Sequence, residues 1–418
     1  MLDTGKIRRQ FPFLKEGIVY LDSAASAQSP ESVLKAMDAF ARADYANVHR
    51  GLYPRADRAT EAYESARRTV QRFLNAAESD EIIFTKNATE ALNLVARSWG
   101  HAHLSEGDAV VLTVLEHHSN VVPWLQLTEE RGVEIVWIDI HDDGSLKMKE
   151  FSSALRRGNV KMVSVTGQSN VLGVRPALEE IIEKAHAAGA LVCVDGAQMI
   201  AHRKIDVRKL DCDFFAFSGH KLYGPTGIGV LYGKRSLLAS MPPFLGGGRM
   251  ITDVKHNRFT PADPPQKFEA GTPPIVQAVG LAAAIDWLET FSWDDIEAHE
   301  SRLLQVATET LAPLPGLRLL GPLGTETSNE QRANEQTSKL VSGCLSFTVD
   351  GIHPHDLAHL LGEEGFCLRA GHHCAQTLHE RLGIPASTRL SVGLYNTEDE
   401  IRSLGTALPP IIKKLRPS

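Results

Sequence analysis

The sequence predicts an α/β protein whose large domain is built on a mainly parallel, seven-stranded sheet. Two observations carry this prediction. Short apolar runs recur between residues 82 and 232, and helical patterns lie between several of them. Alternation of strands and helices favours a parallel sheet with helices on both faces. Several of the runs are apolar nearly throughout, as strands buried on both faces should be.

The predicted strands are the runs richest in β-branched or aromatic residues. They cover residues 82–84, 109–115, 134–140, 161–166, 191–194, 213–217 and 228–232. We expect these seven runs to form the large sheet, because their length and composition are typical of buried strands.

Helices are predicted where apolar residues recur at spacings of three and four. The stretch 60–76 places Tyr63 and Val70 on one stripe. The stretch 176–188 starts with a proline, which suits a first helical position, and Gly189 follows it as a C-terminal cap. Further helices are expected over residues 275–291, 295–311 and 397–415.

The character of the sequence changes after the seventh run. Residues 241–274 hold a Gly-Gly-Gly run, several prolines and little periodicity, and such a long loop is usually functional or part of an interface. Residues 321–340 are polar and are expected to be a surface loop. We therefore place a large domain at residues 15–290 and a smaller C-terminal α/β domain at 291–418, joined by the N-terminal residues 1–14.

Composition limits the class of function. The 418 residues carry a formal net charge of −7 and 6% aromatics, which disfavours nucleic-acid binding. The five cysteines contain no Cys-x-x-Cys pair, so a disulfide framework is excluded and a reducing compartment fits. No signal peptide and no apolar stretch of about 18 residues is found, so we expect a cytoplasmic protein without membrane contact.

Two strand ends carry the residues with the clearest chemistry. Asp195 follows one strand, at the edge where open α/β sheets bind ligands. Lys221 follows another, in the segment Ser218-Gly219-His220-Lys221. Taken alone, each residue also has a purely structural interpretation: Asp195 as a turn residue and Lys221 as a surface lysine. Together they are the groups that pyridoxal phosphate requires, an amine for a Schiff base and a carboxylate for the pyridine nitrogen.

A phosphate site is predicted where the first strand of the sheet runs into a helix. Residues 84–90 include Thr89, and helix N-termini bind phosphate through free N–H groups and a positive dipole end. Ser218 and His220 would complete the cradle. Threonine and asparagine also cap helices for purely structural reasons. This segment alone therefore fits either a phosphate site or a structural helix cap.

With these residues in place, the chain resembles the class V aminotransferase family of fold-type I pyridoxal-phosphate enzymes. Within it, the chain is similar to the group II, or SufS-type, cysteine desulfurases. The matching segments are LDSAASAQ (21–28), HRG (49–51), ATEALNLVA (88–96), EHHSNVVPW (116–124), SNVLG (169–173), VDGAQ (194–198), FSGHKLYGPTGIGVLYG (217–233), FEAGTP (268–273), RAGHHCAQ (369–376) and RLSVGLYNT (389–397). One departure is Tyr53, because the family often ends an HRG-x-H motif with histidine at that place.

The resemblance implies the cofactor, pyridoxal 5′-phosphate, and its contacts. Lys221 would hold it through a Schiff base and move the substrate's Cα proton, while Asp195 would pair with the pyridine nitrogen. The other implied contacts are Gln198 on the ring oxygen, His117 stacked on the ring and shuttling protons, Ala88, Thr89, Ser218 and His220 on the phosphate, and Thr272 reaching that phosphate from the second subunit of a homodimer.

The resemblance also implies the reaction. Cys374 would take sulfur from L-cysteine as a persulfide and leave alanine, and neighbouring histidines and a helix start would favour its thiolate. The short cysteine loop implies transfer to an acceptor protein of the SufE or SufU type, in the service of iron–sulfur cluster assembly. The implied substrate contacts are Asn170, Arg369, His49, Ala24 and Arg389, the last pairing with the substrate carboxylate.

Other readings of the same residues stay open. A selenocysteine lyase uses nearly the same groups, and other members of the family, such as an aminotransferase or a kynureninase-like hydrolase, share the Schiff-base lysine. An aminotransferase would not need Cys374, and a non-catalytic sulfur-relay protein would not need Lys221. A metal site at His372, His373 and Cys374 is disfavoured, because adjacent residues do not easily converge on one tetrahedral ion, and no metal is expected.

Overall fold

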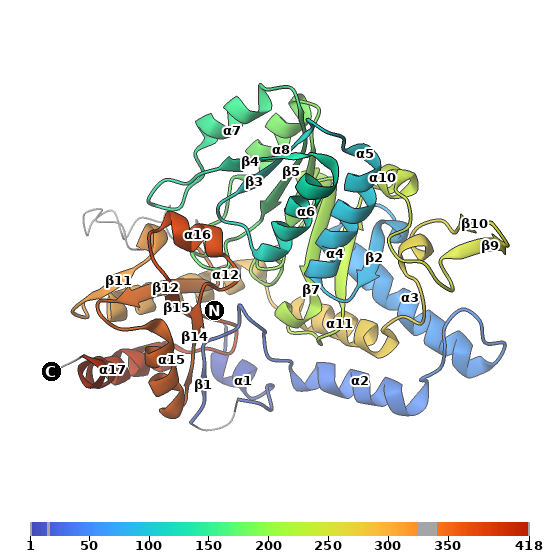
Figure 1. Ribbon diagram of the computed structural model, residues 1–418. Coiled ribbons are helices and arrows are strands. Elements are labelled where there is room, and N and C mark those ends of the chain that lie inside the picture. Colours follow the sequence, from blue (N-terminus) through green and yellow to red (C-terminus); the bar gives the residue numbers. More distant parts are fainter. Residues whose placement is uncertain (1, 15–16, 324–340, 417–418) are drawn as a thin grey trace.

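The computed structural model describes residues 2–14, 17–323 and 341–416. Its largest feature is a seven-stranded sheet with the order β2-β8-β7-β6-β5-β3-β4 (Figure 1). Each of the seven predicted runs is one of these strands, so the predicted sheet is confirmed. The strands are β2 (Ile82–Thr85), β3 (Ala109–Thr113), β4 (Glu134–Ile138), β5 (Val160–Thr166), β6 (Leu191–Asp195), β7 (Phe214–Ser218) and β8 (Gly229–Gly233).

The sheet is parallel except at one strand. β8 runs antiparallel to both of its neighbours, β2 and β7, and the remaining pairs are parallel. The connection from β7 to β8, residues 219–228, is too short for the crossover that a parallel pair needs. This short return places Lys221 at the carboxyl end of β7.

Helices cover both faces of the sheet, as predicted. Successive residues of β3 alternate between two cores: Val111 packs with residues of α8, and Val110 packs with residues of α4 and α6. The covering helices include α3 (Pro54–Leu74), α4 (Ala88–Leu94), α6 (Val122–Arg131), α8 (Leu178–Ala187) and α11 (Ile275–Leu288). The other helices of this part of the chain are α1 (Thr4–Arg8), α2 (Glu31–Ala43), α5 (His101–His103), α7 (Met148–Leu155), α9 (Val207–Leu210) and α10 (Arg235–Ser240).

The predicted helices are present, with one correction at a start. α8 begins at Leu178, so Pro176 is not its first residue but precedes the N-cap, Ala177. Gly189 does close this helix, with a φ of 78° and an N–H donated to the His186 carbonyl. The predicted helices 295–311 and 397–415 are α12 (Trp293–Leu311) and α17 (Glu398–Leu415).

A second, four-stranded sheet has the order β11-β12-β15-β14. In it Arg369 of β14 lies opposite Arg389 of β15. The elements of this region are β11 (Leu317–Leu319), β12 (Cys344–Val349), α15 (Pro354–Glu363), β13 (Phe366–Cys367), β14 (Arg369–Gly371), α16 (Gln376–Arg381) and β15 (Ser387–Ser391). β13 pairs with β1 (Val19–Tyr20) in a separate two-stranded sheet, and an isolated bridge from Asp22 to Ser391 of β15 ties the N-terminal segment to the four-stranded sheet. The domain boundary at residues 290 and 291 stays a prediction, and residues 324–340 of the expected polar loop lie outside the described residues.

The region 241–274 holds a hairpin that the sequence analysis did not predict. β9 (Ile251–Lys255) and β10 (Arg258–Pro261) project from the body of the molecule (Figure 1). Nearly all of their residues are exposed, so the sequence lacks the apolar alternation that marks a half-buried strand.

No single helix in the described ranges has the length and apolar composition needed to cross a membrane. In the described part of the chain, α11 and α12 pass this test of length and composition when they are taken as a pair, and the two helices meet at a bend of 84°.

Candidate active site

One cavity gathers almost all of the residues that the sequence analysis selected. It lies where the carboxyl ends of β5, β6 and β7 meet β14 and β15 of the smaller sheet, which follows from the common direction of parallel strands. The predicted residues lining it are Ala24, Ala88, Thr89, His117, Asn170, Asp195, Gln198, Ser218, His220, Lys221, Arg369, Cys374 and Arg389. His49 and Thr272 do not line it.

Lys221 and Asp195 lie at neighbouring strand ends in this cavity. The Lys221 amine makes no hydrogen bond or ion pair to the described part of the chain. Burial lowers the pKa of Lys221 to about 8, against the opposite pull of Asp195. Asp195 accepts the Ala197 N–H at Oδ1 over 3.0 Å, and burial raises the pKa of its carboxyl. An amine without a partner beside a buried carboxylate fits the groups that pyridoxal phosphate needs.

Hydroxyls and backbone N–H groups form a cradle at the start of α4. The Ala88 N–H donates to Ser218 Oγ over 2.8 Å, and the hydroxyls of Thr89 and Ser119 lie 2.7 Å apart. All four residues line the cavity. A helix start rich in such donors fits a phosphate group.

Two further features shape this cradle. A Cβ added at Gly229 would lie 2.5 Å from Cα of Asn87, so glycine is required for β8 to approach the turn before α4. Nδ1 of His220 lies 3.3 Å from Ser26 Oγ. Burial, and then Lys221, lower the pKa of His220 to about 4, so its ring is neutral near pH 7.

His117 faces the cavity from the turn after β3. Its Nδ1 accepts the Ser119 N–H over 3.1 Å. Burial, and then Lys221, lower the pKa of His117 to about 3, so the ring is neutral and suited to stacking on an aromatic ligand. The preceding Glu116 points into the core, where its carboxyl accepts from the Thr113 hydroxyl over 2.6 Å and the Asn120 amide over 2.7 Å.

Arg389 is the most buried cation of the cavity, with 2% of its surface exposed. Its Nη1 donates to the Asn170 carbonyl over 2.8 Å and its Nη2 to Asp22 Oδ1 over 3.1 Å. Its Nε is buried and has no partner within the described residues. Together with Arg369 across the strand pair, it gives this end of the cavity the positive charge that a carboxylate substrate requires.

The Ala24 backbone closes the cavity near Gln198. The Gln198 amide donates to the Ala24 carbonyl over 2.9 Å, which fixes the orientation of that side chain. The Asn170 amide donates to the His373 carbonyl over 2.6 Å, so Asn170 connects the cavity to the cysteine loop.

Cys374 lines the cavity from the loop before α16. The charge of its thiolate raises the pKa of Lys221, so thiol and amine share one electrostatic environment. Neighbouring histidines are expected to favour this thiolate, and His373, one of them, does not do so through a positive charge. Burial, and then Arg389, lower the pKa of His373 to about 2, so its ring is neutral near pH 7.

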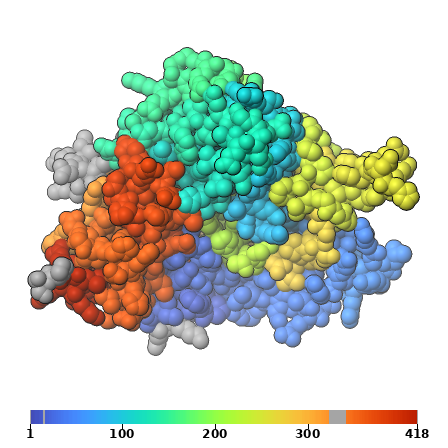
Figure 2. Space-filling model, viewed as in Figure 1, coloured from blue at the N-terminus to red at the C-terminus, as the bar shows by residue number. Residues whose placement is uncertain are grey.

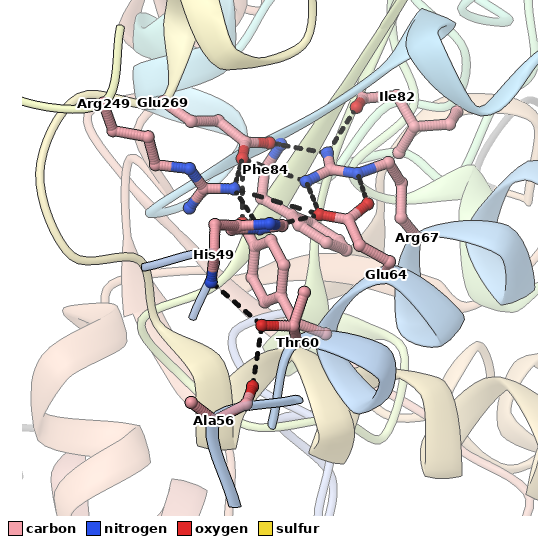
Figure 3. A network of polar contacts seen from close by, with 10 residues as sticks. His49, Ala56, Thr60, Glu64, Arg67, Ile82, Phe84, Arg249 and Glu269 are labelled. Carbon is pink, nitrogen blue, oxygen red and sulfur yellow. Dashed lines mark hydrogen bonds and ion pairs between the residues drawn. The ribbon is translucent and has the colours of Figure 1, made fainter. Parts of the chain in front are cut away.

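His49 lies in a separate polar network, not in the cavity of its own chain (Figure 3). Its Nε2 lies 3.1 Å from Glu64 Oε1 and 3.0 Å from Arg249 Nη2. Arg249 reaches Glu269 at 3.3 Å, and Glu269 accepts two hydrogen bonds from Arg67, at 2.6 and 3.0 Å. A substrate contact by His49 stays a prediction.

Glu269→Gln is expected to lower the free energy of unfolding by about 3 kcal/mol, because the buried guanidinium of Arg67 would lose its buried counter-charge and keep only the partly exposed Glu64, at 2.9 Å. The side chains of Arg67 and Glu269 are 1% and 2% exposed. Urea unfolding followed by circular dichroism measures the change. The matched control is Glu61→Gln, which breaks an exposed pair with Arg68 and should leave the midpoint unchanged. Equal midpoints for Glu269→Gln and wild type would contradict the prediction.

Thr272 lines a second cavity, beside Phe84, Thr85 and Glu269. Its predicted phosphate contact belongs to a second subunit, so one chain does not test it. The structure also adds cavity residues that the sequence analysis did not select: Ala25, Asn87, Ser119, Thr166, Gln168 and Ala197. His373, considered there only as a neighbour of Cys374, lines the cavity as well. Each of these residues lies within four positions of a selected residue. Closeness in sequence is therefore the feature by which the sequence could have indicated them.

No group of three or more His, Cys, Asp or Glu side chains that could hold a metal ion is found within residues 2–14, 17–323 and 341–416.

Comparison with known proteins places this geometry in a family. The family model described as aminotransferase class-V matches residues 19–404. A probable cysteine desulfurase of Streptomyces coelicolor is 45% identical over 414 residues, which are 97% of this chain and 96% of that protein. A cysteine desulfurase of Dickeya dadantii is 43% identical over 416 residues, covering 98% of this chain and 97% of that one.

Solved structures agree with the sequence relatives. The crystal structure of the cysteine desulfurase CsdA (S-sulfonic acid) from Escherichia coli superposes with a TM-score of 0.88 at 38% identity and covers 100% of both chains. The apo structure of a cysteine desulfurase from Thermococcus onnurineus superposes with a TM-score of 0.91 at 37% identity and covers 99% of both. The fold-type I prediction is therefore confirmed, and the chain belongs to the class V aminotransferase family.

Proposed function

We propose that this chain is a pyridoxal 5′-phosphate-dependent cysteine desulfurase that moves sulfur from L-cysteine to Cys374. The observation that carries the proposal is one cavity lined by a lysine amine with no partner among the described residues, a buried aspartate, two arginines and a cysteine. The relatives named cysteine desulfurase over nearly the whole chain support it. Membership of the SufS-type group is part of the proposal.

The proposed chemistry divides among the residues of the cavity. Pyridoxal phosphate supplies, when bound, an electron sink that loosens bonds at the substrate's Cα and Cβ. Lys221 anchors this group and carries the proton of the substrate's Cα. Asp195 holds positive charge at the pyridine nitrogen, and the cradle of Ala88, Thr89, Ser218 and His220 holds the phosphate. Arg389 and Arg369 bind the substrate carboxylate, with Asn170 and Ala24 beside it.

Cys374 is the proposed sulfur acceptor. Its thiolate attacks the sulfur of the bound L-cysteine, a new S–S bond forms, and the Cβ–S bond breaks. The electron pair left on carbon takes up a proton, so the products are L-alanine and a Cys374 persulfide. No external oxidant or reductant is needed, because the sulfur that carbon loses is the sulfur that the thiol gains.

The partners are proposed from the family resemblance. A second copy of the chain would bring Thr272 to the phosphate, and the exposed apolar side chain of Leu245 lines the same cavity as Thr272. An acceptor protein of the SufE or SufU type would take the persulfide sulfur toward iron–sulfur cluster assembly. The cytoplasmic location stays a prediction.

The function is tested by incubating the purified protein with L-cysteine and a thiol reductant. L-alanine and sulfide are expected in equal amounts. If the protein transferred amino groups and released no sulfide, it would be an aminotransferase of the same family and not a cysteine desulfurase. Turnover of L-selenocysteine alone would favour the selenocysteine lyase that the same residues allow.

Arg389→Ala is expected to weaken the apparent affinity for L-cysteine by about 30- to 5,000-fold, the cost of losing a buried charge-assisted pair. The measurement is KM for L-cysteine. Arg235→Ala removes an exposed arginine, 64% of whose side chain is accessible, and should leave KM unchanged. An Arg389→Ala protein with the wild-type KM would remove Arg389 from the substrate site.

The rate at which the cofactor-free protein takes up pyridoxal phosphate is expected to rise with pH through about 8, where Lys221 titrates. Only the unprotonated amine attacks the aldehyde, so uptake is slow below this pH and reaches a plateau above it. Uptake is followed by the absorbance of the lysine adduct near about 420 nm. A rate that keeps rising toward the usual lysine value of 10.5 would contradict the lowered pKa of Lys221.

A further inference from the structure

We propose that His118 is a positioning residue for Cys374, which holds the cysteine loop against the turn that carries His117. The inference deepens the proposed function, since it rests on the role of Cys374 as sulfur acceptor. It concerns the backbone of residues 373–376, which decides where the sulfur lies in the cavity.

The cysteine loop has a strained backbone. His373 and Cys374 have φ values of 52° and 58°, in the left-handed region that L side chains rarely adopt. Two such residues in succession, neither of them glycine, persist only where the surrounding contacts hold them. The loop therefore depends on partners from outside its own segment.

The helix that follows the loop has no cap of its own. α16 begins at Gln376, and its N-cap, Ala375, has no side chain able to accept a hydrogen bond. Nε2 of His118 accepts the Gln376 N–H over 3.0 Å, from 258 residues away in the sequence. The imidazole thus performs the capping that serine or aspartate usually provides locally.

A second contact comes from the backbone of the same residue. The His118 N–H donates to the Cys374 carbonyl over 2.6 Å. His118 therefore contacts the loop both at the cysteine and two residues beyond it. The Asn170 amide holds the His373 carbonyl from another element, so the strained pair is fixed at each end. Figure 2 shows the orange-red segment that contains the loop lying against the teal segment that contains His118.

His118 is itself held firmly enough to act as an anchor. It begins a short helical turn, His118–Asn120, whose last side chain is buried. The Asn120 amide donates to Glu116 over 2.7 Å, and Asn120 Oδ1 accepts from Ser164 of β5 over 2.5 Å. Partial burial, and then His372, lower the pKa of His118, which keeps Nε2 free to accept.

The ring contact is tested by two substitutions that differ in reach. In His118→Gln the amide oxygen can occupy the place of Nε2, whereas in His118→Asn it corresponds to the nearer ring nitrogen and falls short. Alkylation by iodoacetamide is measured on the purified holoenzyme, and peptide mass spectrometry resolves each cysteine. We expect Cys374 in His118→Asn to react about 3- to 10-fold faster, the factor that one hydrogen bond controls. Cys367, partly exposed in β13, should react at the same rate in every variant.

The second readout is turnover of L-cysteine. His118→Asn should lower kcat by a similar factor while KM and the cofactor absorbance stay unchanged, and His118→Gln should restore both the alkylation rate and kcat. The matched control is His359→Asn, because the exposed His359 ring lies on α15, pairs with Glu363 of the same helix and does not line the cavity.

Two results would overturn the inference: a wild-type alkylation rate in His118→Asn, or a His118→Gln protein that behaves like His118→Asn. If wild type releases no sulfide from L-cysteine, the proposed function falls. The alkylation rates still decide whether His118 holds the loop, so the two failures are distinguishable.

Discussion

Replacing Lys221 by alanine is expected to abolish both turnover of L-cysteine and the yellow colour of the purified protein. The amine has two proposed tasks in the cavity, and alanine performs neither. Loss of the proton-carrying group alone costs about 10²–10⁴-fold in rate. Loss of the covalent anchor lowers the rate further, because the cofactor would then be retained only by non-covalent contacts such as those of Ser218 and Asp195. Visible absorbance and L-alanine release are the two measurements.

A second variant separates the reactivity of this amine from its charge. Lys221→Arg keeps a cation in place, but a guanidinium does not lose its proton and cannot form a Schiff base. We expect it to be as inactive as Lys221→Ala. Lys35→Ala, at an exposed lysine of α2 that pairs with Glu31, should behave as wild type. Turnover by Lys221→Ala within tenfold of wild type would remove Lys221 from the chemistry.

The large sheet could be predicted because strands that are buried on both faces have nearly continuous apolar sequences. Every residue of β3 and β7 is buried, and their runs are correspondingly apolar. Asp195 and Lys221 could be placed together for a related reason, since parallel strands end at one edge. The sequence of the β9–β10 hairpin has neither an apolar run nor an apolar alternation, because both faces of the hairpin are exposed.

Contacts between segments far apart in the sequence could not be predicted in the same way. The RAGHHCAQ segment does not show that His373 is buried in the fold. Burial lowers the pKa of its ring, which is therefore neutral, and the sequence alone does not reveal this. His49 belongs to a conspicuous motif, yet in one chain it contacts Glu64 and Arg249, outside the cavity. Both results depend on tertiary packing, which sets desolvation and pairing residue by residue.

Replacing Cys374 by alanine is expected to lower sulfide release from L-cysteine by about 10³-fold or more, as loss of a covalent nucleophile does. The cofactor absorbance should stay unchanged, because the cradle at α4 and the Lys221–Asp195 pair lie on other elements. KM for L-cysteine should also change little, since Arg389 and Arg369 keep the carboxylate site. A loss confined to kcat is what separates a sulfur acceptor from a residue that shapes the cavity.

Cys367→Ala provides the matched control for this variant. Cys367 is also partly exposed, lies two residues before Arg369, and does not line the cavity around Lys221. Its removal should leave alanine and sulfide release at the wild-type level. If Cys374→Ala desulfurates L-cysteine as fast as wild type while both proteins stay yellow, the sulfur leaves by a route that needs no protein thiol. The lysine, aspartate and phosphate cradle would then keep their proposed roles, and the short cysteine loop would need another explanation.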